Sequence, residues 1–404
     1  MMYIGVNNLC NNSNELPTPC YIFDEAEFGR GIDGFKEALL TRFADVAIGY
    51  SVKTNSLPYA LRQARLHGCM AEVVSHDEYQ LAGLCGFEPR EIIYNGPMKS
   101  RETFVEAMQG GAIVNLETKR ELEWLAAMPA GRTYNVGIRL NINISHVSPK
   151  DADSADDNSR FGFSDESSEF ADVLSALKAM TGVRVAGLHI HRTTHWREPR
   201  FYERSVDYAA RVIEKYGLEL DYLDVGGGYF GIFPNKPTFA DYAVAIHNGL
   251  SRHGMERLRI IVEPGNALTA SAFSFLSEVI DVKQVDERTR FVTTDGSRND
   301  IDPFFRKSDY LKEILYRDSS RPAEPRQLVA GCTCLEYDRM FTLSDSPRLE
   351  VGDRILYNNV GAYTLTLTPQ FIRLWPGVYA VDNDGNSRQV RRPSTAADII
   401  LFDK

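Results

Sequence analysis

Lys53 is the first residue whose type and position suggest chemistry. It lies in the segment 50–55, at the end of an apolar run and directly before a helix-start signal. A partly desolvated lysine amine can form a Schiff base with an aldehyde, although a lone lysine is more often a solvated surface residue. Its value as a catalytic group rises if the run is a barrel strand, because active sites gather at the carboxyl ends of such strands.

Three consecutive glycines, Gly226, Gly227 and Gly228, follow Asp224 and the strand-like run 218–223. Because they have no side chains, their amide N–H groups can approach an anion closely, and phosphate is the common occupant of such a turn. A tight turn without a ligand explains a lone triplet equally well.

Glu263 stands at the end of another apolar run, directly before Pro264 and Gly265. A structural ion pair explains such a carboxylate as well as catalysis does. A buried carboxylate can also keep a pyridine nitrogen protonated, which makes the ring an electron sink.

His189 and His191 end a further run, and His195 follows closely. Histidines two residues apart on a strand point the same way, so a metal site is an alternative, as in metal-dependent barrel hydrolases. In those enzymes the pair stands on the first strand, whereas Lys53 and several strands precede it here. We therefore expect no metal and assign His189 to stacking on a ring.

The scaffold for these residues is predicted from an alternation of short apolar runs and helical patterns between about residues 45 and 270. The runs are 46–48, 92–94, 136–138, 185–188 and 260–262. Helix-start signals such as 75–78 and 118–121 fall between them. This alternation is typical of parallel βα units, either closed into a barrel or opened as a doubly wound sheet. Beyond about residue 270, short β-rich segments predict a second, mostly β domain.

Composition narrows the function classes. The 404 residues contain 45 Lys and Arg against 55 Asp and Glu, a net charge of −10 that disfavours nucleic-acid or membrane-surface binding. No run approaches the length of a membrane span, and the N-terminus has no signal-peptide pattern. The six cysteines form no CxxC pair, which indicates reduced thiols and a cytoplasmic protein. The polar, acidic segment 151–159 is expected to be a mobile loop.

Seven segments together resemble the alanine-racemase-like (fold type III) pyridoxal-phosphate-dependent decarboxylases, whose best-known members act on diaminopimelate and ornithine. In chain order they are YSVKTN (50–55), SRFGF (159–163), LHIH (188–191), DVGGG (224–228), EPG (263–265), CTC (332–334) and GAY (361–363). The resemblance implies a (β/α)8 TIM barrel over 31–270 that binds pyridoxal 5'-phosphate (PLP). It also implies a β-barrel-like domain formed by 1–30 and 271–404, and a homodimer with shared active sites.

The resemblance also implies roles for individual residues. Lys53 would be the Schiff-base lysine, Glu263 the partner of the pyridine nitrogen, and His189 the residue stacked on the ring. The three glycines at 226–228 would hold the phosphate together with Tyr363. Cys334, supplied by the other subunit, would donate a proton.

Four departures from the family pattern bear on the substrate. Asn266 replaces the arginine that follows EPG, while Arg192 is gained after the histidines and is expected to replace it at the phosphate. Leu335 stands where the named decarboxylases have an acidic residue, with Glu336 one place later, and Asp302 stands where diaminopimelate decarboxylases have arginine.

From these departures we expect an amino acid or an amino-acid-bearing conjugate as the substrate. Its α-carboxylate would be removed, and diaminopimelate and ornithine are doubtful. Two alternatives stay open: a noncatalytic binding or regulatory relative, and the metal-dependent hydrolase.

Overall fold

The computed structural model describes residues 15–151, 159–192, 196–318 and 320–401. His195 and most of the acidic segment 151–159 lie outside these residues. The chain divides into one compact unit from Gly29 to Leu268 and a second unit that combines the residues up to Phe28 with those from Thr269 onward. Among the described residues, no helix is long and apolar enough to cross a membrane.

The unit 29–268 contains a closed barrel of eight parallel strands, which confirms the predicted (β/α)8 fold. In spatial order they are β2 (Val46–Ser51), β3 (Met70–Ser75), β4 (Ile92–Met98), β5 (Ile113–Leu116), β6 (Tyr134–Asn141), β8 (Val183–Ile190), β9 (Tyr222–Asp224) and β10 (Arg259–Val262). β10 pairs with β2 and closes the barrel, with Ile261 opposite Ala47. The short strand β7 (Phe163–Ser164) pairs with β6.

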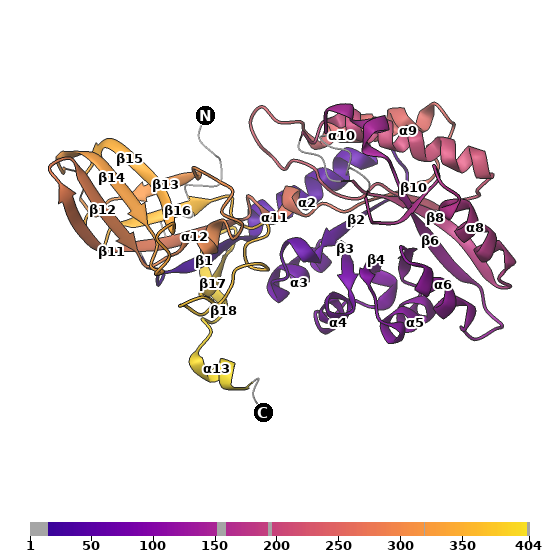
Figure 1. Ribbon diagram of the computed structural model, residues 1–404, viewed down its shortest axis with the longest axis horizontal. Helices are drawn as coiled ribbons and strands as arrows, with labels where there is room; N and C mark the ends of the chain where they lie inside the picture. The colour runs from indigo at the N-terminus through magenta and orange to yellow at the C-terminus, as the bar shows by residue number, and fades with distance from the viewer. Residues whose placement is uncertain (1–14, 152–158, 193–195, 319, 402–404) are drawn as a thin grey trace. The chain divides into compact units, whose positions relative to one another are not determined.

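Helices connect these strands and surround the barrel (Figure 1), while α2 precedes the first barrel strand and α11 follows the last. They are α2 (Glu25–Leu40), α3 (Pro58–Leu66), α4 (His76–Leu84), α5 (Arg101–Gly110), α6 (Lys119–Ala126), α7 (Ile144–Val147), α8 (Glu169–Ala179), α9 (Pro199–Tyr216), α10 (Phe239–Ser251) and α11 (Asn266–Thr269). The predicted start signals operate as capping groups. The Ser75 hydroxyl accepts the N–H of Glu78, and the Glu121 carboxylate accepts the N–H of Thr118.

The strand predicted at 218–223 is shorter than expected. Gly217, in the left-handed region with φ 58°, ends α9, and strand pairing begins only at Tyr222. Tyr222 projects into the barrel core, where Ala47, Ile93 and Ile261 pack with it. Space for its ring comes from Gly187, because a Cβ at that position would overlap the ring.

The second unit is built on a nine-stranded, mostly antiparallel sheet, which confirms the predicted β-rich domain (Figure 1). Its strands are β1 (Cys20–Asp24), β11 (Phe273–Asp286), β12 (Thr289–Thr294), β13 (Lys312–Leu315), β14 (Ala323–Ala330), β15 (Arg339–Pro347), β16 (Arg354–Asn358), β17 (Gly377–Val381) and β18 (Ser387–Arg391). Two short helices, α12 (Arg298–Ile301) and α13 (Ala396–Leu401), complete it. The N-terminal strand β1 lies between β11 and β17, so the two ends of the chain share this sheet.

Candidate active site

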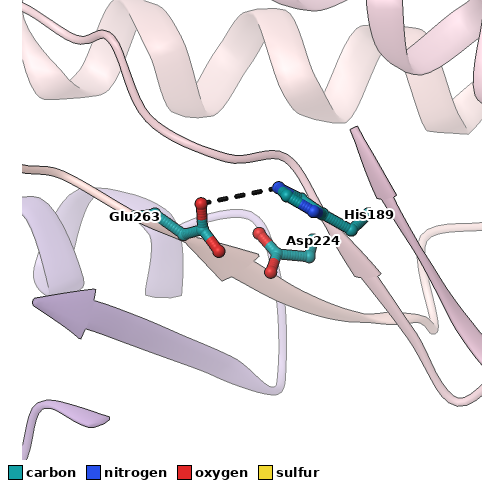
Figure 2. Close-up of side chains that lie close together, drawn as sticks. All are labelled: His189, Asp224 and Glu263. Atoms are coloured by element: carbon teal, nitrogen blue, oxygen red, sulfur yellow. Dashed lines mark ion pairs between the residues drawn. The ribbon is translucent and has the colours of Figure 1, made fainter. Parts of the chain in front are cut away.

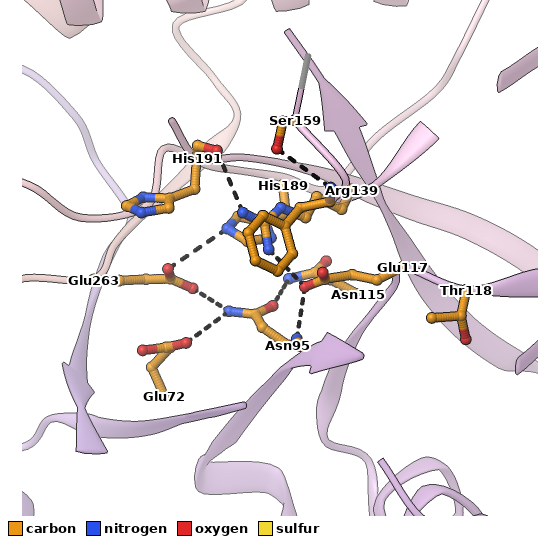
Figure 3. Close-up of polar contacts among 12 residues, drawn as sticks. Glu72, Asn95, Asn115, Glu117, Thr118, Arg139, Ser159, His189, His191 and Glu263 are labelled. Carbon is orange, nitrogen blue, oxygen red and sulfur yellow. Dashed lines mark hydrogen bonds and ion pairs between the residues drawn. The ribbon is translucent and has the colours of Figure 1, made fainter. Parts of the chain in front are cut away.

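Polar side chains from all eight barrel strands or the residues that follow them lie at one end of the barrel, and Figure 3 shows those from six of the strands. The residues at all eight strands are Lys53, Glu72, Asn95, Glu117, Arg139, His189, Asp224 and Glu263. Because parallel strands all end on the same rim, residues far apart in the sequence meet there.

Lys53 lies in the single 3-10 turn η1 (Val52–Thr54) that follows β2. Its Nζ lies 2.5 Å from Oε2 of Glu72, and the Ser51 hydroxyl donates to the same oxygen at 2.7 Å. Glu72 is buried, whereas about one third of the Lys53 side chain (33%) is exposed. The amine is therefore anchored to a buried carboxylate, while part of the lysine side chain remains exposed.

Glu263 follows β10 and is buried between His189 and Asn95. Its Oε2 lies 3.5 Å from Nε2 of His189, and its Oε1 accepts a hydrogen bond of 2.5 Å from Nδ2 of Asn95 (Figure 2 shows the histidine contact). Burial alone would raise the pKa of Glu263, but the nearby His189 and Lys53 hold it well below its usual range. The carboxylate is therefore charged at neutral pH.

Asp224, at the end of β9, behaves in the opposite way. Burial and the neighbouring Glu263 raise the pKa of Asp224 well above its usual range. The two adjacent carboxyl groups interact, and their pKa values are shifted in opposite directions, downward for Glu263 and upward for Asp224.

The glycine turn after β9 passes tightly over the end of β8. Gly226 has φ 70°, and a Cβ there would lie 2.7 Å from the carbonyl oxygen of Ile190. The N–H of Gly226 donates to Asp224 at 3.0 Å, and that of Gly227 donates to Nδ1 of His191 at 3.1 Å. Phosphate binding by these amides stays a prediction, since both are engaged within the chain.

The two strand-end histidines differ in their surroundings. His189 is 1% exposed, and its Nδ1 has no hydrogen-bond partner among the described residues. His191 retains some exposure, and burial together with the cations Arg139 and Lys53 lowers its pKa to about 3. His191 is therefore neutral, which lets its Nδ1 accept the Gly227 N–H. Arg192 follows it and is partly buried.

The sequence-predicted residues of the β-rich unit are solvent-accessible. Cys334 is exposed, and Tyr363 is 42% exposed with a positive φ of 58°. The turn that bears Cys334 is held by the buried carboxylate of Asp338, which accepts hydrogen bonds from Thr333 and Ser297. The barrel thus brings together Lys53 and Glu263 with His189, whereas Cys334 and Tyr363 belong to the other unit.

Sequence reasoning missed five residues of the barrel cluster: Glu72, Asn95, Asn115, Glu117 and Arg139. Asn115, Glu117 and Arg139 are polar residues near the carboxyl end of a buried strand, and that position was the available signal, whereas Glu72 and Asn95 lie in the middle of β3 and β4. Oε1 of Glu117 accepts the Gly96 N–H at 2.6 Å and a bond from Arg139 Nη1 at 2.9 Å. Together these residues line the barrel end with fixed donors and acceptors (Figure 3).

A metal site was the alternative for the histidine pair. Among the described residues, the group with metal-ligand geometry is His189, Asp224 and Glu263, whose ligand atoms lie within 4.8 Å of one another (Figure 2). His191 does not belong to this group, and its Nδ1 accepts the Gly227 N–H.

The same cluster fits a pyridine cofactor that has an aldehyde and a phosphate. Lys53 offers an amine on a partly exposed side chain, Glu263 a buried charge for a ring nitrogen, and His189 a buried nitrogen without a partner. The glycine turn brings backbone amides close to these residues, because a Cβ at Gly226 or Gly227 would overlap His191 or the Glu263 carbonyl.

Comparisons with known proteins agree with this fit. Residues 31–270, more than half of the chain, match the family model described as pyridoxal-dependent decarboxylase, pyridoxal binding domain. The chain is 26% identical over 397 residues to a probable chloroplastic diaminopimelate decarboxylase of Oryza sativa, covering 95% of this chain and 79% of that protein. It is 25% identical over 406 residues to the diaminopimelate decarboxylase of Methanocaldococcus jannaschii, covering 96% of this chain and 91% of that one.

Solved structures show the same similarity. The M. jannaschii diaminopimelate decarboxylase structure has a TM-score of 0.84 at 25% identity, covering 98% of this chain and 94% of that one. The arginine decarboxylase of Paramecium bursaria Chlorella virus, at 20% identity and a TM-score of 0.74, shares the fold and covers 91% of this chain and 96% of that one.

The prediction that this chain is not a diaminopimelate decarboxylase is wrong, because its nearly full-length relatives have that name. Part of that prediction rested on Asp302. The structure shows its carboxylate buried and accepting hydrogen bonds from Arg298 at 3.1 Å, the Lys307 N–H at 2.9 Å and the Tyr310 hydroxyl at 3.2 Å. Asp302 therefore organises its own loop, and its difference from a family motif does not exclude a substrate.

The match to the family model, the full-length relatives and the fit of Lys53 and Glu263 to a pyridine cofactor all lead to one conclusion. The chain belongs to the family of pyridoxal-dependent decarboxylases, and PLP is its cofactor.

Proposed function

We propose that this enzyme removes the α-carboxylate of diaminopimelate. The observation that carries decarboxylation is the buried, ionised carboxylate of Glu263 within a cluster that also contains the anchored amine of Lys53. The substrate is proposed from the names of the relatives, which cover most of this chain.

Pyridoxal phosphate, when bound, supplies a conjugated ring that accepts the electron pair left on Cα as carbon dioxide departs. Lys53 would hold the cofactor through its amine and would give up that position to the substrate amine. Glu263 would accept a hydrogen bond from the protonated ring nitrogen and stabilise the charge there. Cys334 would return a proton to Cα.

We assign ring stacking to His191 in place of His189. His189 is almost fully buried with its Nε2 against Glu263, so its ring offers no open face. His191 is neutral, lies beside the glycine turn and retains some exposure. Gly226, Gly227 and Gly228 with Tyr363 would bind the phosphate, and Arg192 would supply the charge that Asn266 lacks.

A homodimer with shared active sites accounts for the exposed apolar surface of the β-rich unit. Large apolar side chains more than one third exposed there include Phe304, Tyr337, Leu367, Phe371, Ile372 and Trp375. Such surface is typical of an interface between subunits. Because Cys334 is also exposed, we propose that it completes the site of the partner subunit.

We further propose that the functional domains are 31–270 for PLP binding and 1–30 with 271–404 for the β-rich domain. The five described cysteines are free thiols, which supports action in the reducing cytoplasm.

Carbon dioxide release from diaminopimelate, arginine and ornithine tests the substrate assignment. We expect diaminopimelate to give the highest kcat/KM, with lysine as the product identified by mass spectrometry and no release by Lys53→Ala. Release from another amino acid alone would overturn the substrate. No release from any amino acid would favour the noncatalytic alternative.

A further inference from the structure

The Asn95 side chain connects two buried carboxylates, Glu72 and Glu263, which lie at different parts of the predicted cofactor site. Its Nδ2 donates to Oε1 of Glu263 at 2.5 Å and to Oε1 of Glu72 at 3.2 Å. Glu72 in turn contacts Lys53 Nζ through its other oxygen, Oε2. One amide group therefore lies between the carboxylate that holds the lysine and the carboxylate that faces the ring nitrogen (Figure 3).

The orientation of the Asn95 amide is fixed from behind. Nδ2 of Asn115 donates to Oδ1 of Asn95 at 2.8 Å, and the Tyr222 hydroxyl donates to Oδ1 of Asn115 at 2.9 Å. Hydrogen bonds are thus donated in one direction, from Tyr222 to Asn115, from Asn115 to Asn95, and from Asn95 to the two carboxylates. We call this series of hydrogen bonds the relay. Since a flipped Asn95 would place its oxygen against both carboxylates, the relay permits one orientation.

The packing of the barrel core supports this relay. A Cβ at Gly137 would overlap both the Asn115 side chain and the Tyr222 hydroxyl. Asn95 and Asn115 are almost completely buried, at 1% and 0% exposure. Buried amides with all these partners form a satisfied network, which fixes geometry more strongly than separate contacts would.

Two carboxylates in one buried cluster repel each other unless a donor or a proton lies between them. Asn95 supplies two N–H donors at that point and no proton that it can lose. The other charged or titratable groups facing this region come from different elements: Lys53 from η1, His189 from β8 and Asp224 from β9. None of the hydrogen bonds described for those groups bridges Glu72 and Glu263.

We propose that Asn95 is a positioning residue that orients the Glu72 carboxylate toward Lys53 and the Glu263 carboxylate toward the cofactor ring nitrogen. Its single amide group thereby couples the positions of the two carboxylates. This inference rests on the proposed cofactor roles of Lys53 and Glu263. It does not depend on which amino acid is decarboxylated.

Cofactor binding by apo-protein gives the first readout. The probes are PLP and its 1-deaza analogue, in which the ring nitrogen is replaced by carbon. Wild-type protein should prefer PLP by about tenfold or more, the scale of one hydrogen bond to a charged group. Asn95→Asp and Asn95→Ala should reduce this preference to about threefold or less, because Glu263 is no longer aimed at the nitrogen.

Absorbance of the PLP-bound protein gives the second readout. The visible band should change with pH at a lower midpoint in Asn95→Ala than in wild type. Without the amide, the two carboxylates share a proton, and less negative charge faces the nitrogen of Lys53. A change in only one of the two readouts, or in neither, would overturn the proposed coupling.

Two further variants separate positioning from damage to the fold. Tyr222→Phe removes only the first donor of the relay and should reduce the preference in the same direction by a smaller factor. Asn141→Ala is a matched control, because Asn141 also lies at a strand end but donates to the carbonyl of Ser159 at 2.6 Å. If Asn95→Ala fails to fold, Asn95→Asp and Tyr222→Phe decide. An unchanged preference in both would overturn the proposal.

The outcomes also separate this proposal from the proposed function. If diaminopimelate is not decarboxylated but the Asn95 variants lose their preference for PLP, the substrate is wrong and the coupling is supported. If wild-type protein binds PLP and the 1-deaza analogue equally, Glu263 does not face the ring nitrogen, and both the coupling and that cofactor role fail.

Discussion

Nε2 of His189 lies 3.5 Å from Oε2 of Glu263, and both side chains are almost fully buried. A carboxylate in such a place would ordinarily take up a proton, because burial disfavours its charge. Here the nearby His189 and Lys53 hold the pKa of Glu263 well below its usual range, and the Asn95 amide donates a hydrogen bond to the same carboxylate. The barrel therefore presents a permanent negative charge where a pyridinium nitrogen is proposed to bind.

Glu263→Gln tests that charge. The amide preserves the shape of the side chain and removes the anion, so the ring becomes a poorer acceptor of electrons. We expect kcat to fall by about 10²–10³, as for other losses of an oriented electrostatic contact, while the circular dichroism spectrum is unchanged. Glu324→Gln is the control, because Glu324 is a buried carboxylate in the β-rich unit that pairs with Arg348. An unchanged kcat in Glu263→Gln would refute the role.

Arg192→Ala tests whether Arg192 replaces, at the phosphate, the family arginine whose position Asn266 occupies. A phosphate has nearly two negative charges, so loss of one charge-assisted contact should weaken PLP binding by about tenfold. The expected result is faster loss of cofactor on dialysis, measured by absorbance. Arg184→Ala is the matched control, because Arg184 lies at the other end of β8 and pairs with Asp221 on the surface. Retention equal to wild type would place Arg192 outside the phosphate site.

Cys334→Ala tests proton return. The variant should still bind PLP, because cofactor binding does not need the thiol, but it should protonate the wrong carbon more often. Aldehyde and aminated cofactor would then accumulate, which mass spectrometry detects. A packing role alone would lower the thermal stability and leave the product ratio unchanged.

Mixing Lys53→Ala with Cys334→Ala protein tests shared sites. With random exchange, half of the dimers are hybrids that contain one intact site, so about a quarter of wild-type activity should return. Activity that stays at the level of the separate variants would contradict the proposed dimer.

Asp300→Asn tests a pH dependence in the β-rich unit. Burial raises the pKa of Asp300 to about 6, even though Arg373 lies nearby. The unfolded chain has an aspartate pKa of about 4, so the folded state binds this proton more tightly and loses stability as pH rises from about 4 to 6. An asparagine side chain does not titrate, so the variant does not lose stability in this way. The stability of the variant relative to wild type should therefore increase by about 2–3 kcal/mol between pH 4 and pH 7. Thermal unfolding at several pH values checks this, and a constant difference would contradict it.

Continuous motifs allowed the barrel and part of its site to be predicted. Lys53, the glycines at 226–228 and Glu263 stand directly after apolar runs, so the strand-end rule identified them from local sequence. The alternation of runs and capping signals predicted parallel βα units, and the family resemblance implied that these units close into a barrel. The strand near 218 was predicted too long, because hydrophobic residues after Gly217 do not show where pairing with β8 and β10 begins.

Residues that act through tertiary contacts could not be predicted in this way. Glu72 and Asn95 have no motif, and their roles depend on the closing of the barrel, which brings them to Lys53 and Glu263. The different environments of His189 and His191 likewise depend on Gly227 and its turn. Asp302 misled the substrate prediction, because its sequence position did not show that its carboxylate is used within its own loop.

The central claim is that Lys53 holds the cofactor in a pyridoxal-dependent decarboxylase. Borohydride reduction of the PLP-loaded protein, followed by peptide mass spectrometry, tests it most directly, because reduction fixes the cofactor to the lysine that binds it. We predict one cofactor mass on the peptide that contains Lys53, and none on the same peptide of Lys53→Ala. A cofactor mass on another lysine, such as the buried Lys99, or on no lysine at all, would contradict the account.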